Sequence, residues 1–281
     1  PYCKAAIDSA LYDVVGQALR VPAYQLLGGL FRERIPIAHS LGLMEIGKAV
    51  DEALQAKAEG VKTIKLKGGV EQKRDIELVK QIRRAIGPDL NICVDANQGY
   101  PTAKAAAKII KAMEEFNLLY MEQPVEGIDQ MAEVARRVDT PIMADESAWT
   151  AQDVLEIVQK KAADVISIYT TKPGGLFKGK KVASGAEAAG LKCNVNGSVE
   201  TGVGNAANIH LADSTGVVAY GCVVPVSTPK EQSKGGVAGI YYQDDIITEA
   251  FEYADGDVIV AAKPGLGIEL DENKIKHYRI D

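Results

Sequence analysis

Cysteine and histidine, the side chains that most often bind transition metals, are scarce in this sequence. The 281 residues include four cysteines and three histidines. Cys3, Cys93, Cys193 and Cys222 form no CxxC pair, which excludes a zinc-finger pattern and a disulfide framework and indicates reduced thiols. The histidines are equally dispersed, so neither residue type predicts a chemical site.

The sequence also lacks an excess of basic residues and a long apolar run. Its formal net charge is -6, and basic residues alternate with acidic ones, which argues against a nucleic-acid partner or an anionic membrane surface. No apolar run approaches the roughly 18 residues of a membrane span, and the first residues do not form a signal peptide. We therefore expect a cytoplasmic protein with a small-molecule ligand and with no nucleic-acid or membrane partner.

Aromatic residues are few as well, at 6% of the chain, whereas 47% of the residues are hydrophobic and 25% are charged. This composition favours alternating strands and helices over a β-sandwich. The chain is long enough to bury a large core, and its length suits one α/β barrel. The predicted fold class is α/β.

Short apolar runs alternate with amphipathic stretches from Ile35 onward, which is the pattern of repeated strand and helix units. Residues 4–19 precede them with helical spacing. The predicted strands cover 35–38, 63–67, 91–95, 119–122, 142–145, 165–169, 192–196 and 217–221. The predicted helices between them cover 46–59, 71–86, 102–116, 128–137, 151–160 and 176–189. Eight strands in such units predict a parallel sheet closed into a barrel.

Polar and charged residues recur at the ends of the predicted strands, about 23 to 28 residues apart. They are Lys67, Asp95, Glu122, Asp145, Lys172 and Asn196. The carboxyl ends of all strands of such a barrel open at one mouth, where the active sites of these folds lie. We therefore expect these side chains to form one site.

Three carboxylates in this series are the predicted metal ligands: Asp95, Glu122 and Asp145. Each follows an apolar strand, and like charges this close to one another require a cation. Oxygen ligands without histidine or cysteine predict a hard ion, Mg²⁺ first and Mn²⁺ second. A single acid at a strand end is often only a helix N-cap, but three in register favour the metal site.

Lys65 and Lys67 end the second predicted strand, and the two-residue alternation of a strand points both side chains into the barrel. A neighbouring ammonium group and a nearby metal ion both favour a neutral amine, which suits Lys67 to act as a general base. Asn97 and Glu146 are predicted to support the metal ligands or to hydrogen-bond a catalytic lysine. A solvated loop position is the alternative for each of these two residues.

These residue types together predict a reaction. A metal ion that holds a substrate carboxylate would stabilise the dianion formed when the adjacent carbon loses its proton, and Lys67 would take that proton. The sequence therefore predicts proton transfer at the carbon α to a carboxylate, with a small carboxylic acid as substrate.

The sequence resembles the enolase superfamily and, within it, the muconate lactonizing enzyme (muconate cycloisomerase) subgroup of the mandelate racemase and muconate lactonizing enzyme family. The resemblance covers nearly the whole chain. Its landmarks are Ala-Ala-Ile-Asp-Ser-Ala-Leu-Tyr-Asp at 5–13, Leu26-Leu27-Gly28-Gly29, Lys65-x-Lys67, Asp95-x-Asn97, Glu122-Gln123-Pro124, Asp145-Glu146-Ser147, Gly174-Gly175 and Pro264-Gly265-Leu266-Gly267.

The resemblance implies a modified TIM barrel, (β/α)7β, with one Mg²⁺ bound by the three carboxylates and with Lys67, seconded by Lys65, as acid/base. Residues 1–32 would link a capping domain to the barrel, residues 33–225 would form the catalytic barrel, and residues 226–281 would pack back onto it. Relatives carry an N-terminal α+β capping domain, which we expect to be largely absent from this chain. A homo-oligomer is also expected.

The main departure from the resemblance lies on the sixth strand of the family, where a second lysine is normal. Aligning Ile-Ser-Ile-Tyr-Thr-Thr-Lys-Pro-Gly-Gly places Tyr169 at that position and Lys172 three residues later. A racemase needs acid/base groups on both faces of the α-carbon, so Tyr169 favours a one-base reaction in which it donates a proton or orients the substrate. Lys172, which we expect nearer the rim of the mouth, is the rival second group.

Other relatives look less similar. The mandelate racemase pattern has a histidine on the seventh strand, where this chain has Asn194-Val195-Asn196, and the paired aspartates of dipeptide epimerases are missing after the eighth strand. The leading prediction is an isomerase or lyase of the cycloisomerase type, acting on a muconate-like dicarboxylate. The alternatives are β-elimination from a hydroxy acid, racemisation or epimerisation of an amino-acid derivative, and a non-catalytic barrel that binds metal and carboxylate.

Overall fold

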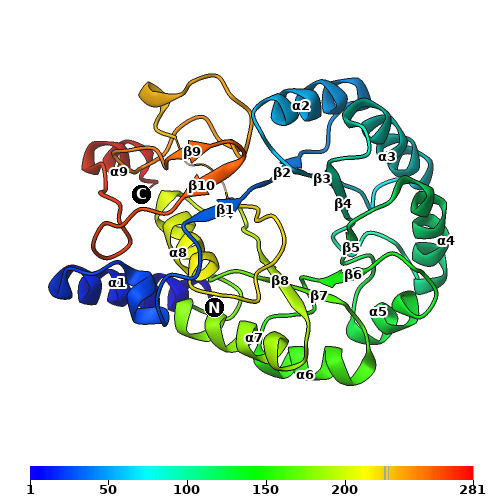
Figure 1. Ribbon diagram of the computed structural model, residues 1–281, viewed down its shortest axis with the longest axis horizontal. Helices are drawn as coiled ribbons and strands as arrows, with labels where there is room; N and C mark the ends of the chain where they lie inside the picture. The colour runs from blue at the N-terminus through cyan, green and yellow to red at the C-terminus, as the bar shows by residue number, and fades with distance from the viewer. Residues whose placement is uncertain (225, 227, 281) are drawn as a thin grey trace.

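The barrel sheet consists of seven parallel strands that follow one another in sequence order (Figure 1). In the computed structural model, which describes residues 1–224, 226 and 228–280, these are β2 (Ala38–Leu41), β3 (Thr63–Lys67), β4 (Asn91–Asp95), β5 (Tyr120–Glu122), β6 (Ile142–Ala144), β7 (Val165–Ile168) and β8 (Lys192–Val195). Every neighbouring pair is parallel, and a helix joins each strand to the next. The predicted strand and helix units are confirmed.

The helices form the outer layer around the sheet (Figure 1), as the apolar face of each predicted helix requires. They are α2 (Ile46–Ala58), α3 (Gln72–Ile86), α4 (Ala103–Met113) with the 3-10 turn η2 (Glu114–Phe116), α5 (Ile128–Ala135), α6 (Ala151–Lys160), α7 (Leu176–Ala188) and α8 (Gly202–Asp213). The sequence pattern misses α8, because ten of its twelve residues are buried and no polar face marks it. No helix of the described residues is long and apolar enough to cross a membrane.

The segment 217–223 closes the barrel between β8 and β2. Val218 forms an isolated parallel bridge with Cys193 of β8, and Cys222 forms one with Ile37, which precedes β2. The eighth predicted strand therefore lies where it was expected but makes single bridges instead of a regular ladder. The resulting arrangement is the predicted (β/α)7β barrel.

A small antiparallel sheet lies beside the barrel and contains β1 (Arg34–Pro36), β10 (Asp257–Ile259) and β9 (Tyr253–Ala254), in that order. The prediction of one barrel strand at 35–38 is wrong. Ile35 pairs with Val258 of the small sheet, and the barrel strand β2 begins only at Ala38. The chain changes sheets after Pro36, which has no backbone N–H to donate to a ladder.

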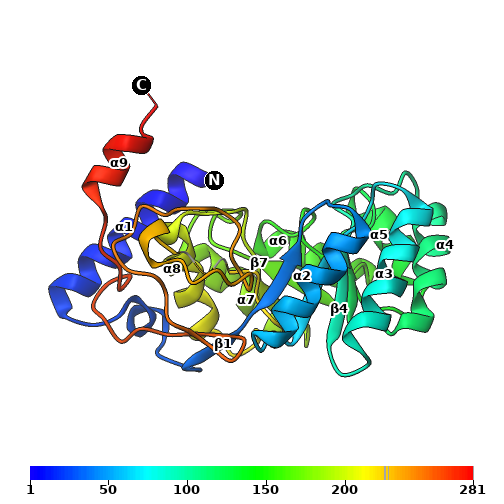
Figure 2. The same cartoon turned by 90° about the horizontal axis from the view of Figure 1, so that it is seen from above.

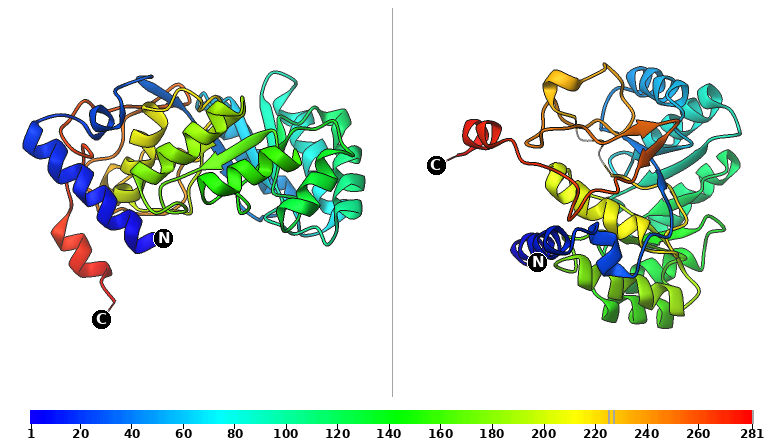
Figure 3. Two further views of the ribbon diagram at one scale, coloured as in Figure 1. Left: turned by 90° about the horizontal axis from the view of Figure 1, so that it is seen from below. Right: turned by 60° about the vertical axis from the view of Figure 1, so that its left-hand side comes forward.

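The C-terminal segment contains η3 (Lys230–Gln232) and α9 (Glu272–Tyr278) in addition to β9 and β10. Strand β10 ends at Ile259, and residues 264–270 make only isolated bridges, from Gly265 and Leu270. Pro225, the predicted boundary between barrel and C-terminal segment, lies outside the described residues. Figures 2 and 3 show this segment and α1 at one end of the molecule, beside the barrel.

The N-terminal elements are α1 (Tyr2–Leu19) and the 3-10 helix η1 (Ala23–Leu27). Two aspartates of the motif at 5–13 fix α1 in place. Oδ2 of Asp8 accepts a hydrogen bond of 2.6 Å from the amide of Leu176 at the start of α7, and Oδ1 of Asp13 accepts one of 2.7 Å from the amide of Leu266. A Cβ on Gly175 would lie 2.3 Å from Cγ of Asp8, so glycine is required there. These landmarks therefore serve the packing of the fold.

Alternation along the strands fills the barrel in two layers. The lower layer is a small apolar cluster of Cys93, Tyr120, Met143 and Val165. Two residues further along each strand, the upper layer is polar and consists of Asp95, Glu122, Asp145 and Ser167. The apolar layer closes the barrel from below, so the polar layer forms the floor of the mouth.

Candidate active site

The predicted metal ligands lie side by side at the mouth of the barrel. In the sheet register Lys67 of β3 pairs with Asp95 of β4, and Asp95 pairs with Glu122 of β5. Asp145 follows the last residue of β6. The three carboxylates are only 1%, 0% and 8% exposed. Because buried like charges are unfavourable without cations, the positive groups around them determine what this site can do.

Lys65 lies between two of the carboxylates. Its Nζ is 3.0 Å from Oδ2 of Asp95, 2.9 Å from Oε1 of Glu122 and 2.8 Å from Oε2 of the same residue. Burial lowers the pKa of Lys65, but the carboxylates of Asp95, Glu122 and Asp145 outweigh it and raise this pKa well above its usual value. Burial and the charge of Asp95 raise the pKa of Glu122 to about 8, against the attraction of Lys65. Lys65 is therefore a charged partner of the carboxylates.

Lys67 is the more accessible lysine. Its side chain is 31% exposed, compared with 6% for Lys65. Its Nζ donates to Oδ2 of Asp95 at 2.8 Å and to Oδ1 of Asn97 at 2.7 Å. Nδ2 of Asn97 donates in turn to Oε1 of Glu146 at 3.0 Å, and burial raises the pKa of Glu146. These hydrogen bonds hold the Lys67 ammonium group at the mouth, where a substrate can reach it.

Lys172 is buried and does not lie at the rim, so the expected rim position is wrong. Its Nζ donates to Oδ1 of Asp145 at 2.5 Å, to the carbonyl of Asp145 at 2.8 Å and to the carbonyl of Ser167 at 2.9 Å. Three acceptors thus satisfy all three N–H groups of the ammonium. Lys172 balances the charge of Asp145 in the way that Lys65 balances the other two carboxylates.

Tyr169 follows β7 and is 9% exposed. Its ring lies 4.7 Å from Nζ of Lys172. Burial and, next, the charge of Asp145 raise the pKa of Tyr169 above its usual value. The phenol therefore stays protonated at neutral pH, where it can donate a hydrogen bond but cannot accept a proton as a base.

Two side-chain amides that the sequence did not predict to contact the carboxylates also hold them. Oε1 of Gln123 accepts hydrogen bonds from the amides of Asp145, at 3.0 Å, and Ser147, at 3.1 Å, and so joins β5 to the end of β6. Nδ2 of Asn196 donates to Oε1 of Glu122 at 3.0 Å. Asn196 was visible in the sequence as a strand-end residue, but its partner was not.

The donor set fits a hard divalent cation such as Mg²⁺. Asp95, Glu122 and Asp145 come from adjacent strands and offer oxygen ligands only, and Oε2 of Glu122 is buried without a hydrogen bond. Within the described ranges, no group of three or more acidic, histidine or cysteine side chains is placed so that it could hold a metal ion, and the ammonium groups of Lys65 and Lys172 lie against these carboxylates instead. Metal binding by these residues stays a prediction.

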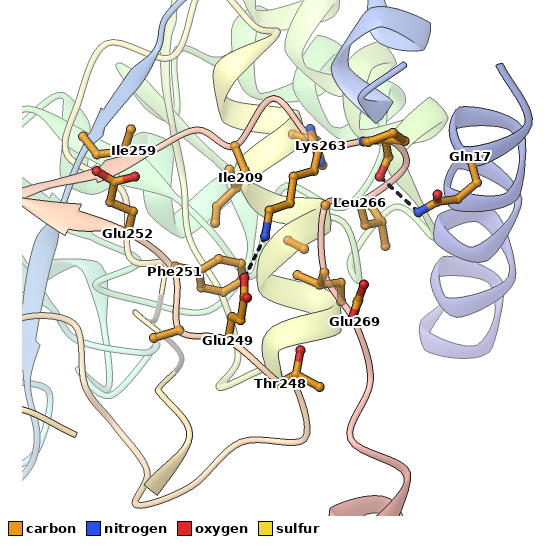
Figure 4. A pocket seen from close by; sticks show the side chains of 17 residues that line it. Gln17, Ile209, Thr248, Glu249, Phe251, Glu252, Ile259, Lys263, Leu266 and Glu269 are labelled. Atoms are coloured by element: carbon orange, nitrogen blue, oxygen red, sulfur yellow. Dashed lines mark hydrogen bonds and ion pairs between the residues drawn. The ribbon is translucent and has the colours of Figure 1, made fainter. Parts of the chain in front are cut away.

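A cavity of about 460 Å³ lies elsewhere, between α1, α8 and the C-terminal segment (Figure 4). Apolar side chains such as Ile209, Phe251 and Leu266 line it, and Lys263 and Glu249 form an ion pair of 2.7 Å beside it. None of the predicted site residues lines this cavity. The mouth of the barrel is therefore the candidate active site.

The chain is thus a (β/α)7β barrel that carries lysines and three carboxylates at the carboxyl ends of its strands. This arrangement places it in the class of barrels whose active-site groups are suited to acid/base chemistry. The chain belongs to the enolase C-terminal domain-like family, whose sequence profile matches residues 48–274. The predicted resemblance to the enolase superfamily and its muconate lactonizing enzyme subgroup is confirmed.

Relatives with different activities match nearly the whole chain. It is 31% identical to N-succinyl-L-Arg/Lys racemase of Bacillus cereus, across 100% of this chain and 72% of the relative. It is 33% identical to muconate cycloisomerase 1 of Rhodococcus opacus, across 99% of this chain and 72% of the relative. The crystal structure of a dipeptide epimerase from Enterococcus faecalis with Mg and L-Leu-L-Tyr matches with a TM-score of 0.83 and 33% identity, across 95% of this chain and 72% of that one. The likeness therefore supports an enzyme, but it spans racemases, epimerases and cycloisomerases.

Proposed function

We propose that the chain is the catalytic barrel of a divalent-metal-dependent enzyme that transfers a proton at the carbon α to a substrate carboxylate. Asp95, Glu122 and Asp145 would bind Mg²⁺, which Mn²⁺ could replace, and Lys67 would carry the proton. When bound, the metal ion supplies the positive charge that the substrate carboxylate needs as its α-carbon becomes anionic. A relative crystallised with Mg supports this choice of ion.

The observation that carries the proposal is the difference between the three lysines of the mouth. The side chain of Lys67 is 31% exposed, whereas those of Lys65 and Lys172 are 6% and 1% exposed. A group that exchanges a proton with a substrate must touch it, so Lys67 is the acid/base. Lys65 and Lys172 hold the carboxylates in place.

The remaining side chains prepare Lys67 for this role. Asp95 and Asn97 each accept a hydrogen bond from its ammonium group, and Glu146 holds Asn97 from the other side. Lys67 would deliver its proton to the α-carbon in the cycloisomerase direction and take it back in reverse. Tyr169, a protonated phenol, would donate a hydrogen bond to the substrate and orient it.

The arrangement favours a one-base reaction of the muconate cycloisomerase type. A racemase or epimerase is the second candidate, because relatives of both kinds match the chain. It would need a second proton carrier on the other face of the substrate. Tyr169 is a poor base, and Lys172 would have to leave three hydrogen-bond acceptors to serve.

A screen of carboxylic acids in D₂O with Mg²⁺, read by NMR and mass spectrometry, tests the proposal. The set includes muconate, N-succinyl amino acids, dipeptides and hydroxy acids. The expected result is a cycloisomerised product or deuterium at one face of the α-carbon. Inversion of configuration at the α-carbon of a substrate would favour a racemase or epimerase. Loss of water from a hydroxy acid would favour a dehydratase. Binding of an acid with no exchange in any member of the set would contradict an enzymatic role.

A further inference from the structure

Asn196 reaches across the barrel to a proposed metal ligand. It follows β8, whereas Glu122 ends β5, three strands away in the sheet order. Asn196 is 2% exposed. Its Nδ2 donates to Oε1 of Glu122 at 3.0 Å and to Oγ of Ser167 at 3.0 Å.

The neighbouring Asn194 fixes which way the amide of Asn196 points. Nδ2 of Asn194 donates to Oδ1 of Asn196 at 2.8 Å, so that Oδ1 is the acceptor end of the amide. The opposite end then carries the two N–H donors toward Glu122.

The two oxygens of Glu122 consequently differ. Oε1 accepts hydrogen bonds from Nζ of Lys65 at 2.9 Å and from Nδ2 of Asn196 at 3.0 Å. Oε2 is buried and accepts no hydrogen bond, although Nζ of Lys65 lies 2.8 Å from it. Donors from β3 and β8 therefore both hold Oε1, whereas of these two donors only Lys65 lies against Oε2.

We propose that Asn196 is a positioning residue, which fixes the carboxylate of Glu122 so that Oε2 is presented to a divalent cation. This inference rests on the proposed function, because it takes Glu122 to be a metal ligand. Asn196 itself binds neither metal nor substrate. Its effect on the reaction passes through the orientation of Glu122, as is common for the hydrogen-bond partners of metal ligands.

Calorimetric titration of the purified chain with Mn²⁺ and with Mg²⁺, without substrate, tests the inference. Asn196→Ala should weaken metal binding about 10- to 100-fold. Ser167→Ala is the matched control, since it removes the other acceptor of the Asn196 amide and leaves the contact with Glu122. It should weaken binding much less. Circular dichroism and thermal unfolding of the metal-free variants establish that each is folded.

A double-mutant cycle keeps the test decisive even where Asn196→Ala disturbs the fold. In a Glu122→Gln background the added Asn196→Ala should cost no further affinity, because the carboxylate that it orients is gone. The inference is overturned by an Asn196→Ala variant of wild-type affinity, or by an equal loss in both backgrounds. Absence of metal binding by the wild-type chain would instead refute the proposed function, and the inference with it.

Discussion

The ammonium group of Lys67 lies 2.8 Å from Oδ2 of Asp95. The proposed proton carrier is therefore hydrogen-bonded to a proposed metal ligand, so a loss of activity alone does not show which of the two functions a variant has lost. Metal affinity and proton exchange must for this reason be measured separately.

The first prediction concerns the metal ligands. Asp145→Asn and Glu122→Gln should each lower Mg²⁺ affinity by at least about 10-fold, or about 1.4 kcal/mol, because a neutral amide oxygen replaces a charged ligand. Calorimetric titration measures the loss. Glu126→Gln, at an exposed position after β5, is the control and should bind like the wild type. Full affinity in both site variants would refute the metal site.

Tyr169→Phe should lower turnover modestly, by about 10-fold or about 1.4 kcal/mol, because one hydrogen bond to the substrate is lost. Deuterium should still enter at one face only. Tyr278→Phe, on the exposed side of α9, is the control. Entry of deuterium at both faces, with one face lost in Lys172→Ala but not in Tyr169→Phe, would instead establish an epimerase with Lys172 as second base.

The stability of the chain should depend on the buried Asp213 at the end of α8. Burial raises the pKa of Asp213 to about 6, against the attraction of His210. The unfolded value is about 4, so the folded state binds the proton more tightly, and the free energy of unfolding falls as pH rises from about 4 to about 6. Asp213→Asn should remove this fall. At pH 8 its free energy of unfolding should be about 1 to 3 kcal/mol higher than that of the wild type, and below pH 4 the two free energies should differ little.

Urea unfolding at pH 4, 5, 6 and 8 measures this difference. The comparison is between Asp213→Asn and the wild type at each pH, so that other titrating groups cancel. Parallel stability profiles for the two proteins across the whole range would show that the pKa of Asp213 is the same in the folded and the unfolded chain, and would contradict this prediction.

Asp8→Ala should destabilise the fold without touching the site. The carboxylate of Asp8 takes the place of a side-chain N-cap for α7, because the residue before this helix is Gly175. Loss of such a cap costs about 1 kcal/mol of unfolding free energy, and Asp8→Asn should retain most of it. Urea denaturation of the two variants measures the difference. Equal stability of Asp8→Ala and wild type would assign the motif at 5–13 another role.

The sequence predicts the barrel well because its units carry local signals. Each strand from 63 to 196 alternates with an amphipathic helix, and each of the three carboxylates ends or follows such a strand. The pattern does not predict two features correctly. The helix α8 is buried on nearly all sides and so has no polar face, and Ile35 looks like a barrel residue although it pairs with Val258 far along the chain.

Residue placement could be predicted more readily than side-chain partners. Strand spacing brings Lys172 and Asn196 to the mouth, but it does not say what each touches. Lys172 proves to be buried on Asp145, and Asn196 crosses the barrel to Glu122. The first contact joins two neighbouring strands and the second spans three strands of the sheet, and both depend on which buried charge each donor can satisfy. These contacts therefore depend on the assembled barrel and cannot be predicted from a single strand.

The α-proton exchange of the Lys67→Ala variant tests the central claim most directly. The measurement uses the acid that exchanges fastest with the wild type, in D₂O with saturating Mg²⁺, and it is paired with a Mn²⁺ titration of the same variant. Lys108→Ala, on the exposed face of α4, is the control. We predict that Lys67→Ala abolishes exchange and still binds metal, because the ammonium group carries the proton and is not a ligand. Exchange at the wild-type rate would remove Lys67 from the reaction.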